Sequence, residues 1–448
     1  MKQLFYLSIL SILFISCGGS ERVSSTIISS FGEQPYVTLT PAGKVELVFA
    51  NDESIYYSSS IDDGHSFSKP SLVAKHGGLV LGYSCGPSIA TTSTTMVVIA
   101  PDTLGNLNSW SRLVNAEVWS GPFRVNDRDN SVGEFLSDIT SAPDGTLHSV
   151  WIDTRFLKPE NTSEHAVVQS KHQSIEFAKT AQEELAEMTP IGITKGELFE
   201  KIGTIPKNAA LAFHSDQEGN LYWVFLDTDK NVLKAENYEE YKEFRKRNES
   251  KLIAQGKIYS SSSQDGGKTW SKSKLIYRSP DGSVCECCKP SIISDKKGNI
   301  TVMFRNNLNG SRDLHFVQSF NGGETFSIAE KLGTGTWKIN GCPMDGGDAI
   351  INNRGELKTV WQRKGDIFRS NSSTSENKIG SGRSPSISAN STKTYTIFSQ
   401  GEDILTTTSE HSTPTKIGTG FSPKVQALQN GAIYFWVNSN GIHFVKVP

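Results

Sequence analysis

Three cysteines lie within four positions in the stretch SVCECCKPSI of this 448-residue chain. Cys285, Cys287 and Cys288 could form disulfides, hold a metal ion or supply a reactive thiol. Cys85 in SCGPSI and Cys342 in NGCPMDGG each precede a short strand-like segment as well. Because five cysteines can form at most two disulfides, at least one thiol of this set stays unpaired.

The cysteines leave several interpretations open. In the first, Cys85 and Cys342 pair with members of the 285–288 cluster and staple neighbouring parts of the fold; a Cys287–Cys288 bridge would be strained and is disfavoured. In the second, the thiolates hold a soft ion such as Cu(I) or Zn(II), with Met344 nearby. The spacing C-x-C-C is not a usual zinc spacing. A reactive thiol is the third.

A second set of candidate residues is polar and follows strand-like runs. It consists of Asp153 and Arg155 in WIDTR, Arg305 and Asn306 in MFRNN, Arg312 and Asp313 in GSRDL, Arg363 in VWQRK, and Asp345 and Asp348 in MDGGDAI. Converging arginines could clamp a planar carboxylate, and carboxylates could do acid–base work on a glycosidic bond. Alternatively, the arginines and aspartates pair with one another and hold the fold together; for Asp153 and Arg155 both interpretations stay open.

Three segments, at 60–67, 263–270 and 319–326, share the form S-x-[DN]-x-G-x-[ST]-[FW]. In such a turn the Asp or Asn caps its own backbone, the glycine accepts positive φ and the aromatic residue packs beneath. The segments resemble the Asp box, or BNR repeat, of the sialidase-like β-propellers, which implies a propeller fold and a structural role for the boxes. The box residues are Asp62, Gly64, Asp265, Gly267, Trp270, Asn321 and Gly323.

A larger unit also repeats and predicts an all-β chain. Its starts are QPYVTL, GPSIAT, SDITSA, KPSIIS, DGGDAI, SPSISA and SPKVQA, each followed by a turn and a hydrophobic strand. We therefore predict a seven-bladed β-propeller within residues 18–448, with the six blades of the sialidases as the alternative. The last unit has three strands, and residues 22–30 alternate like the strand that could close the ring.

The third unit is interrupted by residues 158–255. Segments 174–188 and 237–255 have helical periodicity, and a hairpin pattern lies between them. We predict a small α+β insertion, with an extra blade containing the hairpin as the alternative.

The first 17 residues have the layout of a signal peptide, and FISC resembles a bacterial lipobox that would be lipidated at Cys17. The expectation is an exported protein, anchored by lipid on the periplasmic or cell-surface side of a bacterial membrane, with an ordinary signal peptide as the alternative. The net charge of −2 gives no support to nucleic-acid binding.

The repeat register places Cys85, Cys288 and Cys342 just before the first strands of three units. First strands of a propeller line its central channel, so we expect these cysteines at one rim of that channel. A glycan or another small molecule is the ligand expected there.

The chain is similar to the bacterial sialidase-like BNR-repeat proteins over most of residues 34–448. This resemblance implies an exo-α-sialidase-like protein that acts on or binds terminal acidic sugars, with an arginine triad, a tyrosine nucleophile assisted by a glutamate, and an aspartate as acid–base. Arg305 or Arg312 could match a triad arginine, and Tyr83 and Tyr277 are candidates for the tyrosine. The Arg-Ile-Pro motif of true sialidases is missing from SFGEQPYVTLTP. The alternative is a non-catalytic propeller that binds a protein partner or a soft metal at the cysteine rim.

Overall fold

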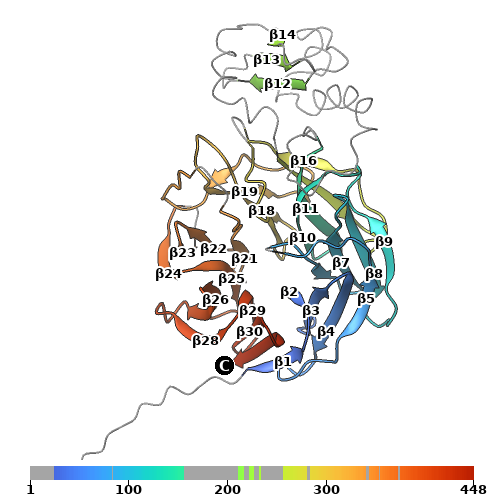
Figure 1. The fold of residues 1–448 in the computed structure, drawn as a ribbon, viewed down its shortest axis with the longest axis vertical. Coiled ribbons are helices and arrows are strands. Elements are labelled where there is room, and N and C mark those ends of the chain that lie inside the picture. Colours follow the sequence, from blue (N-terminus) through green and yellow to red (C-terminus); the bar gives the residue numbers. More distant parts are fainter. Residues whose placement is uncertain are drawn as a thin grey trace, which may run out of the picture.

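The computed structural model describes residues 25–82, 84–155, 256–279, 283–339, 343–352, 354–371 and 374–448, together with the backbone of 210–215, 221–226 and 232–233. Strands occur throughout these residues and helices do not, so the described chain has no helix able to cross a membrane. Seven four-stranded antiparallel sheets are arranged as blades around a central axis (Figure 1). The prediction of a seven-bladed propeller is confirmed, and the six-bladed alternative is not.

Within blades 1 to 6 the strands follow chain order from the axis outward. Blades 1 to 3 consist of β2 (Glu33–Leu39), β3 (Val45–Asn51), β4 (Ser54–Ser60) and β5 (Ser71–Lys75); β6 (Ser88–Thr91), β7 (Thr95–Pro101), β8 (Leu107–Leu113) and β9 (Ser120–Arg124); and β10 (Val132–Ser141), β11 (Leu147–Asp153), β15 (Lys257–Ser263) and β16 (Lys274–Tyr277).

Blades 4 to 6 consist of β17 (Ser291–Ser294), β18 (Ile300–Arg305), β19 (Leu314–Ser319) and β20 (Glu330–Lys331); β21 (Asp348–Ile351), β22 (Leu357–Arg363), β23 (Asp366–Ser370) and β24 (Asn377–Ser381); and β25 (Arg383–Ala389), β26 (Thr394–Gln400), β27 (Asp403–Thr408) and β28 (Thr415–Thr419). Blade 7 consists of β29 (Phe421–Ala427), β30 (Ala432–Asn438), β31 (Gly441–Val447) and β1 (Thr26–Ser29).

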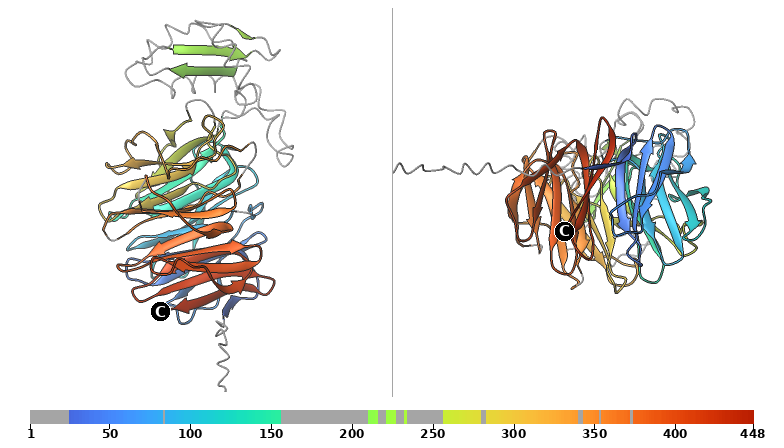
Figure 2. Two further views of the ribbon diagram at one scale, coloured as in Figure 1. Left: turned by 90° about the vertical axis from the view of Figure 1, so that its left-hand side faces the viewer. Right: turned by 90° about the horizontal axis from the view of Figure 1, so that it is seen from below.

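The second strands are rich in apolar residues and largely buried, because both of their faces are covered by neighbouring blades. β11 and β18 are buried along their whole length. The hydrophobic core is accordingly divided among the blade interfaces: Ile152 of blade 3 packs with Ile300 of blade 4, and Val48 of blade 1 with Met96 of blade 2. Figure 2 shows the blades from the side, one sheet behind the next around the ring.

The ring is closed by the N-terminal strand of the described chain. β1 pairs antiparallel with β31, with Thr26 opposite Phe444 and Ile27 opposite His443. The sequence prediction that a strand within 22–30 completes the last blade is therefore confirmed. Two segments far apart in sequence are hydrogen-bonded in one sheet, in which β1 covers the edge of β31 and is itself the outermost strand.

Each Asp box forms the turn between the third and fourth strands of its blade and packs on the preceding blade. In blade 3, Trp270 Nε1 donates to Ser109 Oγ at 3.0 Å, and Ser109 Oγ donates to the carbonyl of Gly267 at 2.8 Å. Gly267 has φ +82°, and a Cβ there would approach Val97 to 2.7 Å. The box thus joins the outer edge of blade 3 to blade 2.

The interrupting segment contributes a separate sheet. β12 (Ala210–Ser215) pairs antiparallel with β13 (Leu221–Leu226), and β13 pairs with β14 (Val232–Leu233). The first pair is a hairpin at the place where the sequence predicts one, and its sheet is not part of a blade. The predicted helical segments 174–188 and 237–255, the signal segment with Cys17, and Tyr83 and Cys342 lie outside the described residues.

Candidate functional site in the central channel

A proline opens the innermost strand of five blades. Pro35, Pro87, Pro290, Pro385 and Pro423 each stand one residue before the pairing with the second strand is established. The channel side of an innermost strand is an unpaired edge, where the missing N–H of proline costs no hydrogen bond. The residue before the proline has positive φ in four blades, which bends the chain at the channel mouth: Gln34 (54°), Gly86 (147°), Ser384 (52°) and Ser422 (51°).

One position per blade follows this bend and forms a ring around the axis. The ladder registers make the equivalent residues Tyr36, Ser88, Asp138, Ser291, Asp348, Ser386 and Lys424. All of them except Ser88 line one inner cavity. A phenol, hydroxyls, two carboxylates and an ammonium at equivalent positions are typical of a polar ligand site, because a packed core would place apolar side chains there.

Two cavities share Tyr36, Lys289, Gly347 and Lys424 in their walls. The outer cavity, at the channel mouth, has a volume of about 80 Å³. The inner cavity, along the innermost strands, has a volume of about 270 Å³. Cavities of this size suit a single sugar ring or a molecule of similar size rather than a polymer.

Tyr36, Asp138 and Lys289 form a hydrogen-bonded group across three blades. Tyr36 Oη donates to Asp138 Oδ1 at 2.9 Å, and Lys289 Nζ lies 3.5 Å from the same oxygen and 4.8 Å from the centre of the Tyr36 ring. The backbone N–H of Ile292 donates to the other carboxylate oxygen at 3.1 Å. Burial raises the pKa of the Tyr36 phenol well above its usual value, and the Asp138 charge acts in the same direction. Tyr36 is therefore a neutral donor at neutral pH.

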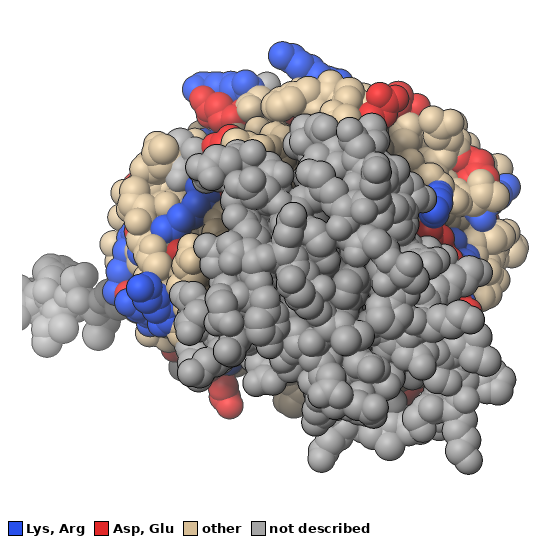
Figure 3. Space-filling model, turned by 90° about the horizontal axis from the view of Figure 1, so that it is seen from above, with Lys and Arg blue, Asp and Glu red and all other residues tan. Residues whose placement is uncertain are grey.

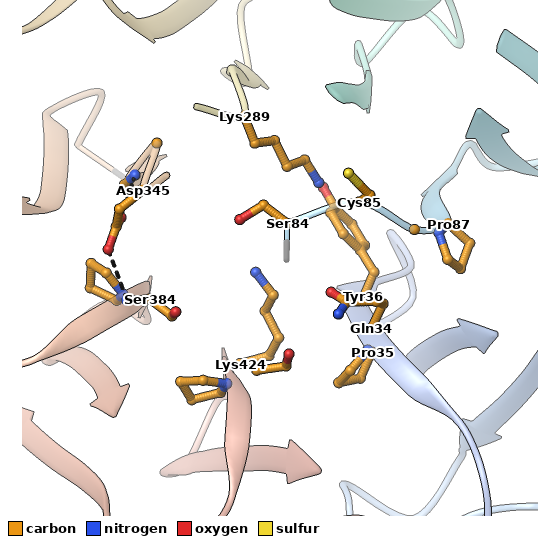
Figure 4. A pocket seen from close by; sticks show the side chains of 16 residues that line it. Gln34, Pro35, Tyr36, Ser84, Cys85, Pro87, Lys289, Asp345, Ser384 and Lys424 are labelled. Carbon is orange, nitrogen blue, oxygen red and sulfur yellow. Dashed lines mark hydrogen bonds between the residues drawn. The ribbon is translucent and has the colours of Figure 1, made fainter. Parts of the chain in front are cut away.

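Lys424 differs from Lys289 because its ammonium makes no hydrogen bond or ion pair with any described residue. Its side chain extends into the cavity between Ser384 and Tyr36 (Figure 4). Burial lowers the pKa of the amine below its ordinary value, the charge of Lys289 acts in the same direction, and the Asp348 carboxylate opposes the shift. A cationic group held in a cavity with no counter-ion bonded to it is a ready site for an anion.

Two carboxylates from blade 5 complete the site. Asp345 accepts hydrogen bonds from the backbone N–H groups of Gly347 at 3.1 Å and Ser384 at 2.9 Å. Asp348 accepts from Ser386 Oγ at 2.9 Å and from the Ile387 N–H at 3.1 Å. Burial raises the pKa of both carboxyl groups. Both side chains therefore join blade 5 to blade 6 and also present oxygen acceptors to the cavity.

The predicted arginine clamp does not form around this channel. Arg305 is 1% exposed, and its guanidinium donates to the backbone carbonyls of Asp345, Gln362 and Arg312 at distances between 2.6 and 3.0 Å. Arg312 follows the same strand at the junction of blades 4 and 5, and its buried Nε has no partner among the described residues. Neither arginine lines the two cavities.

The other predicted arginines are paired within the blades. Arg155 bonds Asp153 through Nε and Nη2, each at 2.9 Å, and contacts Asp127 at 3.0 Å. Arg363 makes a two-pronged ion pair with Glu376 at 2.7 and 2.6 Å. For Asp153 and Arg155, the structure thus shows the pairing that the sequence left open. Of the predicted polar residues, only Asp345 and Asp348 lie in the channel walls.

Tyr277, the second tyrosine candidate, lies on the outermost strand β16 and not at the axis. Its hydroxyl accepts a hydrogen bond from Asn306 Nδ2 at 2.8 Å, and its ring packs 4.4 Å from that of Phe304.

The cysteine cluster lies beside the channel mouth, in the loop that leads into β17. Cys285 and Cys288 are buried, with Sγ atoms 3.3 Å apart, and Cys287 Sγ lies 3.6 Å from Cys285 Sγ. Cys287 is disulfide-bonded, whereas Cys85, Cys285 and Cys288 are thiols. The expectation that Cys85 staples the cluster is therefore wrong. Cys85 lines the mouth, as predicted from the repeat register, but Cys285 and Cys288 do not.

The three sulfur atoms of the cluster lie within 4.8 Å of one another, but Cys287 is disulfide-bonded, so the cluster does not offer three thiolates to a soft ion. Met344, named from the sequence as a possible further ligand, is 43% exposed, in contrast to the buried thiols.

Sequence reasoning missed Tyr36, Asp138, Lys289 and Lys424 as site residues. The signal was available, because all four stand in the starts of the repeat units. Aligning these starts by their prolines shows the position after the proline occupied by tyrosine, serine and lysine in different units, and Asp138 stands before an isoleucine, as serine does in GPSIAT, KPSIIS and SPSISA. Such variation at a structurally equivalent position indicates a role that differs from blade to blade.

No family model and no curated protein matches this chain. Among solved structures, the chain resembles an α-L-arabinanase from Penicillium chrysogenum complexed with arabinobiose (10% identity, 95% of this chain and 98% of that chain, TM-score 0.43). It also resembles the intramolecular trans-sialidase from Ruminococcus gnavus (11% identity, 94% and 93%, TM-score 0.39) and the Hadza microbial sialidase Hz136 (11% identity, 92% and 65%, TM-score 0.40). The chain thus spans about two thirds of the length of the last of these. Likeness at this level does not bear on the activity of this chain.

Proposed function

We propose that the channel binds a terminal acidic sugar of a glycan and that Lys424 takes its carboxylate. The observation that carries this proposal is the Lys424 ammonium, which extends into the cavity without a bonded counter-ion among the described residues. A lysine acts as a point charge toward a carboxylate and needs no planar partner geometry. One lysine in this place would do part of the work that the missing arginine clamp does in a sialidase.

The remaining groups of the cavity suit the hydroxyls of a sugar. Asp345 and Asp348 supply acceptors, and the Ser386 hydroxyl, which donates its hydrogen to Asp348, supplies a further acceptor oxygen. These carboxylates also disfavour an anion that lacks hydroxyl donors, because like charges repel. The site therefore favours a hydroxylated monoanion over a simple carboxylate.

The cellular setting of this proposal comes from the sequence. A lipid anchor on Cys17 would hold the propeller on the outer side of a bacterial membrane, where glycans are encountered. A metabolic labelling experiment with a palmitate analogue, comparing the natural chain with Cys17→Ala, tests the anchor. Loss of label and release from the membrane fraction are expected; unchanged membrane association would contradict it.

The binding test compares Lys424→Met with Lys416→Met by isothermal titration calorimetry. Lys416 lies on blade 6 and is 51% exposed, so its variant controls for loss of one positive charge. The ligands are methyl α-sialoside, methyl glucuronide and the neutral methyl galactoside. We expect the natural protein and Lys416→Met to bind an acidic sugar and Lys424→Met to lose about tenfold or more in affinity. Equal affinity in Lys424→Met, or binding of the neutral sugar alone, would overturn the proposal.

Hydrolysis of the same sugar is a second candidate function, favoured by the contact between Tyr36 Oη and Asp138 Oδ1. Asp138 is placed to accept the phenolic proton while Tyr36 attacks the anomeric carbon, and Lys289 lies beside the carboxylate before it takes that proton. The glycosidic C–O bond breaks, and the aglycone leaves with a proton from water or from Asp138. Water then cleaves the tyrosyl–sugar bond, which releases the sugar and returns the proton to Tyr36. Fluorogenic α-sialosides and β-glucuronides test this step. Release that is lost in Tyr36→Phe and Asp138→Asn would support it, whereas no release from any acidic glycoside, with binding intact, would leave a binding protein.

A further inference from the structure

The sulfur pair Cys285–Cys288 has the geometry of a dithiol. The two residues have the C-x-x-C spacing, their backbones form a turn with the Cys288 N–H donating to the Cys285 carbonyl at 3.2 Å, and their Sγ atoms lie 3.3 Å apart. A disulfide needs an S–S distance of about 2.05 Å, so a side-chain rotation closes the gap without moving the blades. Cys287 is already disulfide-bonded and does not compete for this pair.

Positive charge surrounds the first thiol of the pair. The hydrogen bond from Cys288 lowers the pKa of Cys285 to about 7, and the guanidinium groups of Arg312 and Arg305 act in the same direction. Burial instead raises the pKa of Cys288 well above its usual value, and its contact with Cys285 adds to the increase. The buried Arg312 Nε has no partner among the described residues, so it is able to receive an anionic oxygen or sulfur. The two thiols are thus chemically unequal, one a nucleophile and one a neutral donor.

We propose that Cys285 and Cys288 form a peroxide-reactive dithiol, a site separate from the sugar cavity. The Cys285 thiolate attacks one oxygen of hydrogen peroxide, the O–O bond breaks, and hydroxide leaves with formation of a Cys285 sulfenic acid. The Cys288 sulfur then attacks Cys285 Sγ, the S–O bond breaks, and water leaves as the disulfide forms. Two electrons pass from the two sulfur atoms to the peroxide. The Cys288 proton leaves in the water of the second step, and solvent protonates the hydroxide of the first step.

The burial of Cys285 and Cys288 determines which oxidants can reach their sulfur atoms. Cys285 is 0% and Cys288 1% exposed, so a protein oxidoreductase cannot reach either sulfur without unfolding the loop. Hydrogen peroxide has nearly the size of water and needs only a small fluctuation of the 283–289 loop. The site is therefore suited to a diffusible oxidant and not to exchange with a partner protein.

The test treats the protein, purified without reductant, with hydrogen peroxide and maps the cysteines by mass spectrometry. In the natural protein we expect loss of two hydrogen atoms from the peptide that contains Cys285 and Cys288, located as a bond between these two residues. In Cys288→Ser the sulfenic acid has no partner thiol, and dimedone is expected to label Cys285. In Cys285→Ser neither product is expected. Cys85→Ser, which changes a thiol at the channel mouth, is the matched control and should behave as the natural protein.

Three outcomes would overturn this assignment. The first is that the natural protein forms no bond between Cys285 and Cys288 at peroxide doses that oxidise exposed methionine. The second is that dimedone labels Cys285→Ser and Cys288→Ser equally. The third is that Cys285→Ser is oxidised to the same extent as the natural protein. The result for the natural protein decides the matter if a serine variant fails to fold, as checked by its thermal unfolding. Binding of acidic sugars, measured in parallel, is expected to be unchanged in Cys285→Ser and Cys288→Ser, because neither residue lines the two cavities, so failure of either proposal can be recognised separately.

Discussion

At the scale of single residues, the protonation of Lys424 should decide how pH affects ligand binding. Burial and Lys289 lower its pKa, so it loses its proton at a lower pH than an ordinary lysine, whose pKa is about 10.4. Binding of an anionic sugar should persist at acidic and neutral pH and weaken as the pH rises through this lowered pKa. Calorimetric titrations across the alkaline range measure the loss.

The acidic groups that face Lys424 determine how the affinity for the ligand changes below neutral pH. Burial raises the pKa values of Asp345 and Asp348, so these carboxyl groups take up protons at a higher pH than ordinary aspartates as the pH falls. Their neutralisation removes repulsion of the ligand. Affinity for the anion should therefore not decline on moderate acidification. An affinity that rises with pH would contradict the role of the ammonium.

The buried ammonium of Lys424 should favour ligand binding but lower the stability of the folded protein. Because the folded pKa of Lys424 lies below that of the unfolded chain, the unfolded chain binds more protons, and the charged side chain disfavours folding at neutral pH. This cost disappears only above the unfolded pKa. Lys424→Met should raise the free energy of unfolding at pH 7 by about 1 kcal/mol, while Lys416→Met changes it by less than about 0.5 kcal/mol. Urea unfolding measures both, and a destabilised Lys424→Met would show that the ammonium makes favourable contacts.

At the scale of elements, the Asp boxes should contribute to stability through the turn and not through chemistry. Asp265 accepts hydrogen bonds from Ser263 Oγ, the N–H groups of Lys268 and Thr269, and Thr269 Oγ1, at distances between 2.6 and 3.1 Å. We expect Asp265→Ala to lower the free energy of unfolding by about 1–2 kcal/mol. Asp265→Asn should cost less, because Asn321 occupies the same place in blade 4 and accepts from Ser319 Oγ at 2.9 Å and the Thr325 N–H at 3.0 Å. Equal losses in the two variants would show that the charge matters more than the bonding pattern.

The elements also explain why the fold was predictable and the site less so. Strands, box turns and the closing strand are specified by local patterns, so their number and order could be read from the sequence. The candidate arginines, by contrast, were taken from the ends of second strands. Arg155, Arg305 and Arg363 stand there, and a second strand is separated from the axis by the first strand of its blade. Only alignment of the first strands, where Tyr36, Asp138 and Lys424 stand, would have indicated the channel walls.

At the scale of the whole molecule, the charges of the described surface are mixed. The face in Figure 3 shows basic and acidic side chains of described residues around its rim, in keeping with a net charge of −2. The surface therefore supplies no strong field of one sign to attract an anionic ligand from a distance. Selectivity for an anion has to arise inside the channel, where Lys289 and Lys424 converge.

The closed ring predicts that one short strand stabilises the whole propeller. Ile28 of β1 packs on the core between blades 7 and 1, whereas Ile27 is 49% exposed on the opposite face. Ile28→Asp removes apolar burial and places a charge at this junction, so it should lower the free energy of unfolding by about 2–3 kcal/mol. Ile27→Asp, the matched control, should change it by less than about 0.5 kcal/mol.

Urea unfolding, followed by tryptophan fluorescence, measures this effect for all blades at once. Loss of β1 would leave β31 as an exposed edge and remove the hydrogen bonds that join the two ends of the ring. In the closed ring every blade is held by a neighbouring blade on each side. If the ring opens at one junction, blades 7 and 1 are each held on one side only, and unfolding can start from them and spread to the next blades. We therefore expect Ile28→Asp to shift the unfolding of the entire propeller to lower urea concentration. A shift confined to a minor early phase would mean that the other six interfaces hold the ring together without the closing strand.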